Sequence, residues 1–133
     1  AGAPSEVCAR LDYDFDSGWR FVRVSPRPII PIPERPRWAK MWVMGDGKDG
    51  QSRLRVIDSD GQVFQPDYGR LDFTHWRCLI ADMTCQRAGH WGGKNDGIVR
   101  YPLSWDTLFL LDNVGGRKQS GRVYLGTLML CYD

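Results

Sequence analysis

Residues 122–132, RVYLGTLMLCY, decide the fold class that the sequence predicts. Apolar side chains occupy both alternating sets of positions, Val123, Leu125, Thr127, Met129 and Cys131 in one set and Tyr124, Gly126, Leu128, Leu130 and Tyr132 in the other. Successive side chains of a strand point to opposite faces of its sheet. A strand with two apolar faces is covered on both of them. We therefore predict that this segment is a central strand.

The rest of the chain has the pattern of an all-β protein. Turn signals recur about every eight to twelve residues, and no long segment shows the period of a helix. The predicted strands are residues 10–15, 19–24, 38–44, 53–58, 62–65, 76–81, 107–111 and 122–132. A chain of 133 residues, 42% of them hydrophobic, is long enough to bury one core. We predict one domain, residues 1–133, folded as a two-sheet antiparallel β-sandwich.

Two turns predict hairpins. Asp16-Ser17-Gly18 separates the first two predicted strands, and GDGKDG, residues 45–50, separates the next two. Glycine and aspartate are typical of such turns because they accept backbone angles that other residues avoid. Residues 66–69, PDYG, are predicted to end the strand before them.

A proline-rich segment, residues 25–36, contains five of the eight prolines of the chain. Proline cannot donate a backbone hydrogen bond, so the segment is expected to be an extended connection. A long connection of this kind suits a chain that crosses from one sheet to the other. The three isoleucines within it, Ile29, Ile30 and Ile32, favour packing on the core.

Composition excludes several classes of function. A formal charge of +2, with basic and acidic residues interspersed, argues against nucleic acid or an anionic membrane as the principal partner. No apolar run reaches the roughly 20 residues that span a bilayer, and the first ten residues lack the features of a secretory signal. Cys8, Cys78, Cys85 and Cys131 show no Cys-x-x-Cys spacing, which leaves their disulfide state open.

One loop combines the chemistry of a binding site. Residues 90–106, HWGGKNDGIVRYPLSWD, surround a short apolar run with three glycines, and they can present Trp91, His90, Asn95 and Asp96 on one side. The alternative is that Trp91 caps the core while residues 95–97 form an ordinary turn. Sequence leaves both interpretations open.

Aromatic and planar polar side chains are the groups that recognise sugars. The chain has six tryptophans and five tyrosines. We expect Trp91 and Trp38 to be exposed because they border flexible or proline-bound segments, and Trp42, Trp76 and Trp105 to pack between the sheets. Arg53 and Arg55 share one face of a strand, where they suit a glycan or an anionic sugar; a merely solvated face explains them equally well.

Several segments resemble carbohydrate-binding modules of the galactose-binding-domain-like type, which accompany bacterial polysaccharide-degrading enzymes. The segments that carry the likeness are Tyr13-Asp14-Phe15-Asp16, GDGKDGQSRLRVIDSDGQVFQ (45–65), DFTHWR (72–77), HWGG (90–93), SGRVYL (120–125) and Tyr132-Asp133. The likeness lies in the order and the general composition of these segments, and no single diagnostic motif carries it. It implies a jelly roll of two sheets with about five strands each, with the sugar bound on a concave sheet face or at the loops of one end.

The resemblance also implies a cofactor, a partner and a location. Such modules often hold a structural calcium between the first and last strands, and the matching residues here are Asp14 or Asp16 and Asp133. These acids can equally be solvated strand ends. The resemblance further implies a secreted or extracellular monomer, attached to a catalytic domain, that binds a polysaccharide or oligosaccharide.

Enzymatic activity has no specific sequence support. The two histidines lack the spacing of a zinc site, and no Gly-x-Ser-x-Gly or phosphate-loop motif occurs. The sequence therefore favours a non-catalytic carbohydrate-binding module. The alternative is a structural or protein-docking β-sandwich without affinity for glycans.

Overall fold

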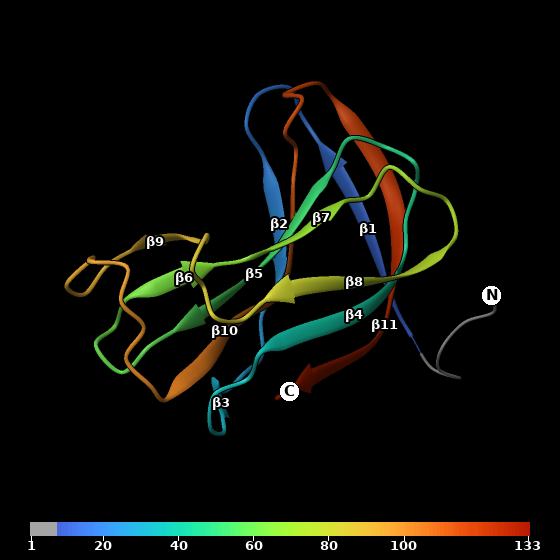
Figure 1. Ribbon diagram of the computed structural model, residues 1–133. Helices are drawn as coiled ribbons and strands as arrows, with labels where there is room; N and C mark the ends of the chain where they lie inside the picture. Colours follow the sequence, from blue (N-terminus) through green and yellow to red (C-terminus); the bar gives the residue numbers. More distant parts are fainter. Residues whose placement is uncertain (1–7) are drawn as a thin grey trace.

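A computed structural model describes residues 8–133, and this part of the chain contains strands and loops but no helix. Its strands are β1 (Ala9–Phe15), β2 (Phe21–Val24), β3 (Ile30–Ile32), β4 (Trp38–Met44), β5 (Gln51–Ile57), β6 (Val63–Gln65), β7 (Asp67–Arg70), β8 (Trp76–Asp82), β9 (Gly89–Trp91), β10 (Leu103–Asp112) and β11 (Gln119–Cys131). They form two antiparallel sheets packed face to face (Figure 1). The predicted two-sheet antiparallel β-sandwich is confirmed.

The two sheets differ in size. A four-stranded sheet has the order β1-β11-β4-β8. A seven-stranded sheet follows the path β2-β10-β5-β6-β9, with β3 paired to β10 and β7 paired to β5. The resemblance implied about five strands in each sheet, so the division of strands is less even than expected.

Strand β11 lies between β1 and β4, which confirms the predicted central strand. The apolar side chains on both of its faces predict that both faces are covered, but their cause is a change of register within the strand. A register shift between Leu125 and Leu128 changes which set of side chains points inward. Leu125 is buried before the shift, Leu128 packs on the core after it, and Met129 is exposed. A β-bulge inserts one residue and so exchanges the two faces.

Both predicted hairpins are wrong. β1 pairs with β11 whereas β2 pairs with β10, so the turn after β1 carries the chain to the other sheet. β4 and β5 are likewise in different sheets. Distant loops bind the backbone of these turns: the Gly18 amide donates to Gly116 O, and the Gly47 amide to Leu71 O and Phe73 O. A turn signal shows that the chain reverses but not which strand lies beside it.

Two connections also differ in part from their predictions. The strand before residues 66–69 ends at Gln65, as predicted, but Asp67–Arg70 then form β7, which pairs with β5 as β6 does. The proline-rich segment crosses between the sheets as predicted, yet it also contributes the short strand β3 to one side of β10. Ile32 is buried there, whereas Ile29 and Ile30 are exposed. Proline is accepted in a strand of this kind because it lies at an edge.

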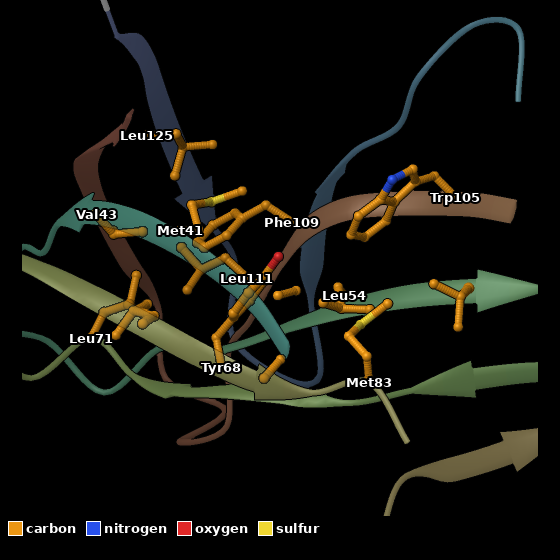
Figure 2. Close-up of a cluster of buried hydrophobic side chains, with 14 of the residues drawn as sticks. Met41, Val43, Leu54, Tyr68, Leu71, Met83, Trp105, Phe109, Leu111 and Leu125 are labelled. Carbon is orange, nitrogen blue, oxygen red and sulfur yellow. The ribbon is translucent and has the colours of Figure 1, made fainter. Parts of the chain in front are cut away.

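The core fills the space between the two sheets. Figure 2 shows Met41, Val43 and Leu125 from the four-stranded sheet packed with Leu54 and Phe109 from the other. Trp105 is buried among them, as predicted. The prediction that Trp42 and Trp76 pack between the sheets is wrong. Ala39, Met41 and Val43 occupy the inward positions of β4, so Trp42 points outward.

Candidate functional site

Exposed aromatic residues gather on the outer face of the seven-stranded sheet. Leu54 and Val56 of β5 point into the core, so Arg53 and Arg55 point outward, as predicted. Trp91 of β9 lies opposite Val63, which is on the same outer face, because the next residue of β6, Phe64, is buried. Alternation thus places Trp91 on the outside of the sandwich, which rules out its role as a cap on the core.

Arg55 connects aromatic rings from the two borders of this sheet. Its Cζ lies 5.0 Å from the ring centroid of Trp91 on β9 and 5.6 Å from that of Phe21 on β2. Trp19 extends the row, since its ring centroid is 5.1 Å from that of Phe21. The exposed fractions are 40% for Trp91, 39% for Phe21 and 67% for Trp19. We call these four residues the aromatic row.

Polar groups flank the aromatic row. Arg55 donates from Nε to Gln65 Oε1 at 2.7 Å. Arg53, two residues earlier, forms ion pairs of 2.7 Å with both Asp67 and Asp112. The face therefore offers flat apolar rings next to amide, carboxylate and guanidinium groups. This combination stacks on a sugar ring and exchanges hydrogen bonds with its hydroxyls.

His90 and Asn95 bind each other. His90 Nδ1 lies 2.6 Å from Asn95 Oδ1, so the imidazole donates this hydrogen bond. His90 alternates with Trp91 and lies opposite Phe64, on the other side of the strand from the aromatic row. Asn95 and Gly97 both have positive φ, which bends the loop back over the imidazole. We infer that this pair shapes the loop that follows Trp91.

Asp96 is also bound within the loop. Its carboxylate accepts bonds of 3.0 and 2.6 Å from the two terminal nitrogens of Arg100, and one of 3.0 Å from the Ile98 amide. The buried Gln62 side chain ties this loop to the β5–β6 turn, since it accepts from the Gly97 amide at 2.8 Å and donates to Ile98 O at 3.1 Å. Of the residues predicted in this loop, only Trp91 belongs to the aromatic row.

Acid is expected to weaken this loop. The hydrogen bond from Arg100 is the largest of the effects that hold the pKa of Asp96 well below its usual 3.8. A depressed pKa contributes stability that is present above the unfolded value and is lost as pH falls toward the folded one. Between about pH 5 and about pH 3, the urea midpoint should therefore fall more in the wild type than in Asp96→Asn. Equal falls in both proteins would contradict this role of Asp96.

Trp38 lies on a different surface, the outer face of the four-stranded sheet. Trp42 and Met44 follow it at alternate positions of β4, and Trp76 lies opposite Met44. The tryptophans are half-buried, and exposed Ile80 and Met129 flank them. The sheet order thus separates Trp38 from the aromatic row, so the structure does not bring all the predicted sugar-binding residues together.

The acids predicted to hold calcium lie far apart. Asp14 pairs with Ser120 at one end of β11, whereas Asp133 follows Cys131 at the other end. At about 3.3 Å per residue these ends are separated by roughly 35 Å. Calcium ligands lie within about 2.6 Å of the ion, so neither Asp14 nor its near neighbour Asp16 can share an ion with Asp133. Within residues 8–133, no group of three or more metal-binding side chains gathers.

All four cysteines are free in the described part of the chain. Cys8 is exposed, whereas Cys78 and Cys131 are half-buried on the outer face of the four-stranded sheet. Cys85 is the buried thiol, and its burial raises its pKa to about 12. Cys85 therefore stays protonated and unreactive near neutral pH.

Trp19 and Phe21 were not among the predicted binding residues. The alternation of Phe21 with Val22 was visible, but it did not show which side of the strand faces the core. The register does, because Val22 lies opposite the buried Leu111 and Val24 opposite the buried Phe109.

Residues 8–133 include no helix with the length and apolar character needed to cross a membrane. Comparison with known proteins found no matching family model, no matching curated protein and no matching solved structure.

Proposed function

We propose that this protein is a non-catalytic carbohydrate-binding module that holds an attached glycan-degrading enzyme on its polysaccharide outside the cell. The observation that carries the proposal is the aromatic row, in which Trp19, Phe21 and Trp91 are exposed on one sheet face. Large aromatic side chains are usually buried, so their alignment on an open surface needs a functional reason. Stacking against the C–H face of a pyranose provides one.

The open shape of this surface also favours binding over catalysis. The aromatic row reaches from β9 at one border of the sheet to β2 at the other, so it matches an extended chain. Asp67 and Asp112 beside it are both paired with Arg53. A glycosidase needs two carboxylates that act on opposite sides of one bond. Carboxylates engaged with an arginine suit recognition rather than proton transfer.

The geometry favours a site on the sheet face over a site at the loops of one end. His90, Asn95 and Asp96 use their polar groups within the loop. Trp91 and Arg55, by contrast, present their side chains on the outer face. We infer that the loop network holds Trp91 in position, and that the sugar contacts the sheet.

Affinity gel electrophoresis of the isolated protein tests the proposal. The panel contains β-glucan, xylan, mannan, pectin and sulfated algal glycans, each with calcium and with chelator. We expect at least one class of polysaccharide to retard the protein, and any effect of chelator would reveal a dependence on calcium. If no member retards it, and insoluble glycans do not bind it either, the proposed function is wrong.

Protein docking is the second candidate function, through the outer face of the four-stranded sheet. Exposed Ile80 and Met129 lie there beside half-buried tryptophans, and such a patch fits the apolar surface of another protein. Pull-down of the attached catalytic domain would detect this contact. The double variant Ile80→Ser, Met129→Ser should weaken the contact if it uses this face, while leaving the retention of polysaccharide unchanged.

A further inference from the structure

Arg55 differs from the other arginines of the outer face in its partners. Arg53 is bound by Asp67 and Asp112, each at 2.7 Å, and Arg23 lies 3.4 Å from Asp106. Within residues 8–133, no carboxylate lies within 4.0 Å of the Arg55 guanidinium. Its hydrogen-bond partner there is the neutral Gln65 amide, which accepts from Nε.

Arg55 lies between two aromatic rings and, within the described residues, has no direct ion-pair partner. Burial, followed by repulsion from Arg23, lowers its pKa, and attraction from Asp106 and Asp112 offsets this effect only in part. Phe21 and Trp91 attract the guanidinium through their ring faces but accept no conventional hydrogen bonds from it. Among residues 8–133 the two terminal nitrogens have no hydrogen-bond partner, and as a planar pair of donors they match an anionic group that binds through two oxygens.

We propose that the aromatic row binds an anionic glycan, and that Arg55 recognises its carboxylate or sulfate group. The inference rests on the proposed function and adds the class of ligand. Trp91 and Phe21 would stack on sugar rings on either side of the acidic group, while Gln65 holds Nε and so fixes the plane of the guanidinium. Specificity for the acidic sugar then depends on one residue.

A general attraction to polyanions does not explain this arrangement. Three arginines on the face, Arg23, Arg53 and Arg55, are balanced by the three acids Asp67, Asp106 and Asp112. Binding of nucleic acid is carried by many unbalanced positive charges that contact phosphates. A guanidinium that lies between aromatic rings, without a direct ion pair in the described part of the chain, instead suits one acidic substituent held at a defined place.

Pairs of polysaccharides that differ in charge test this inference. Polygalacturonate is compared with its methyl ester, and a sulfated galactan with its desulfated form, by affinity electrophoresis at low and at moderate salt. We expect the acidic member of one pair to bind about tenfold or more tightly than its neutral form. The pair that responds identifies the group as carboxylate or sulfate.

Variants show whether Arg55 carries the preference. Arg55→Gln should lose about tenfold in affinity for the acidic glycan and little for the neutral one, and Arg55→Lys should recover only part of the loss because it lacks the planar fork. Arg23→Gln removes the same charge from the same face and is the matched control, with an expected loss below about threefold. Thermal unfolding of each variant confirms its fold.

The outcomes separate this inference from the proposed function. Equal binding of acidic and neutral members overturns the inference and leaves carbohydrate binding intact. Equal losses in the Arg55 and Arg23 variants, or equal retardation by double-stranded DNA, would show general charge attraction and overturn it as well. If no polysaccharide is retained, both the inference and the proposed function fail.

Discussion

Replacement of Trp91 by alanine should weaken retention by polysaccharide about 30-fold, measured by affinity electrophoresis. Trp91 is exposed on the outer face of the seven-stranded sheet, where Arg55 lies 5.0 Å from its ring centroid. The alanine variant would lose the stacking surface and one of the two rings beside the guanidinium. Since the ring is not part of the core, the free energy of unfolding should change little.

Trp38→Ala is the matched control for this experiment. Trp38 is also a partly exposed tryptophan, but it lies on the outer face of the other sheet. We expect Trp38→Ala to keep the retention of the wild type. A loss in Trp38→Ala with none in Trp91→Ala would move the binding surface to the four-stranded sheet and contradict the assignment of the aromatic row.

Replacement of Phe109 by alanine should lower the free energy of unfolding by about 3–5 kcal/mol. Phe109 is fully buried and stacks on Tyr68 at a centroid distance of 6.2 Å. Its removal leaves a cavity between the sheets that β10, held in place by β5 and β2, closes only in part. Urea unfolding followed by circular dichroism measures the change.

Trp19→Ala provides the comparison for this prediction. The side chain is large but 67% exposed, so its loss should change the free energy of unfolding by no more than about 0.5 kcal/mol. A loss of less than about 1 kcal/mol in Phe109→Ala would mean that the core between the sheets is less closely packed than the structure shows.

The fold class could be predicted because it depends on local pattern. Alternation in residues 38–44 and 76–81 identified two strands within a residue of their observed ends. Pairing could not be predicted, because it depends on which distant segment covers a strand. The turns after β1 and β4 have the composition of hairpin turns, yet each leads to the opposite sheet. The backbone groups of these turns bind loops that are remote in sequence.

The candidate site was likewise predicted only where it depends on local pattern. The exposure of Trp91 and the shared face of Arg53 and Arg55 were predicted correctly. The predicted loop of residues 90–106 was wrong at both ends, because Trp91 lies in β9 and residues 103–106 lie in β10. The outward position of Trp42 did not follow, because alternation separates two faces without showing which one is buried. The contact of Arg55 with Phe21 joins residues that are 34 positions apart, and no local pattern indicates it.

The sequence by itself determined most of the strands, the single apolar core and the residue types that could bind a sugar, because side-chain alternation and turn chemistry are local properties. It did not indicate the short strands β3, β7 and β9. Tertiary structure alone decided the pairing of strands, the face on which each tryptophan lies and the separation of Asp14 from Asp133. Tertiary structure also decided that Arg53 forms ion pairs with two carboxylates, whereas Arg55 forms none within residues 8–133. The physical reason is that these features depend on contacts between distant segments, which form only when the two sheets close on one core.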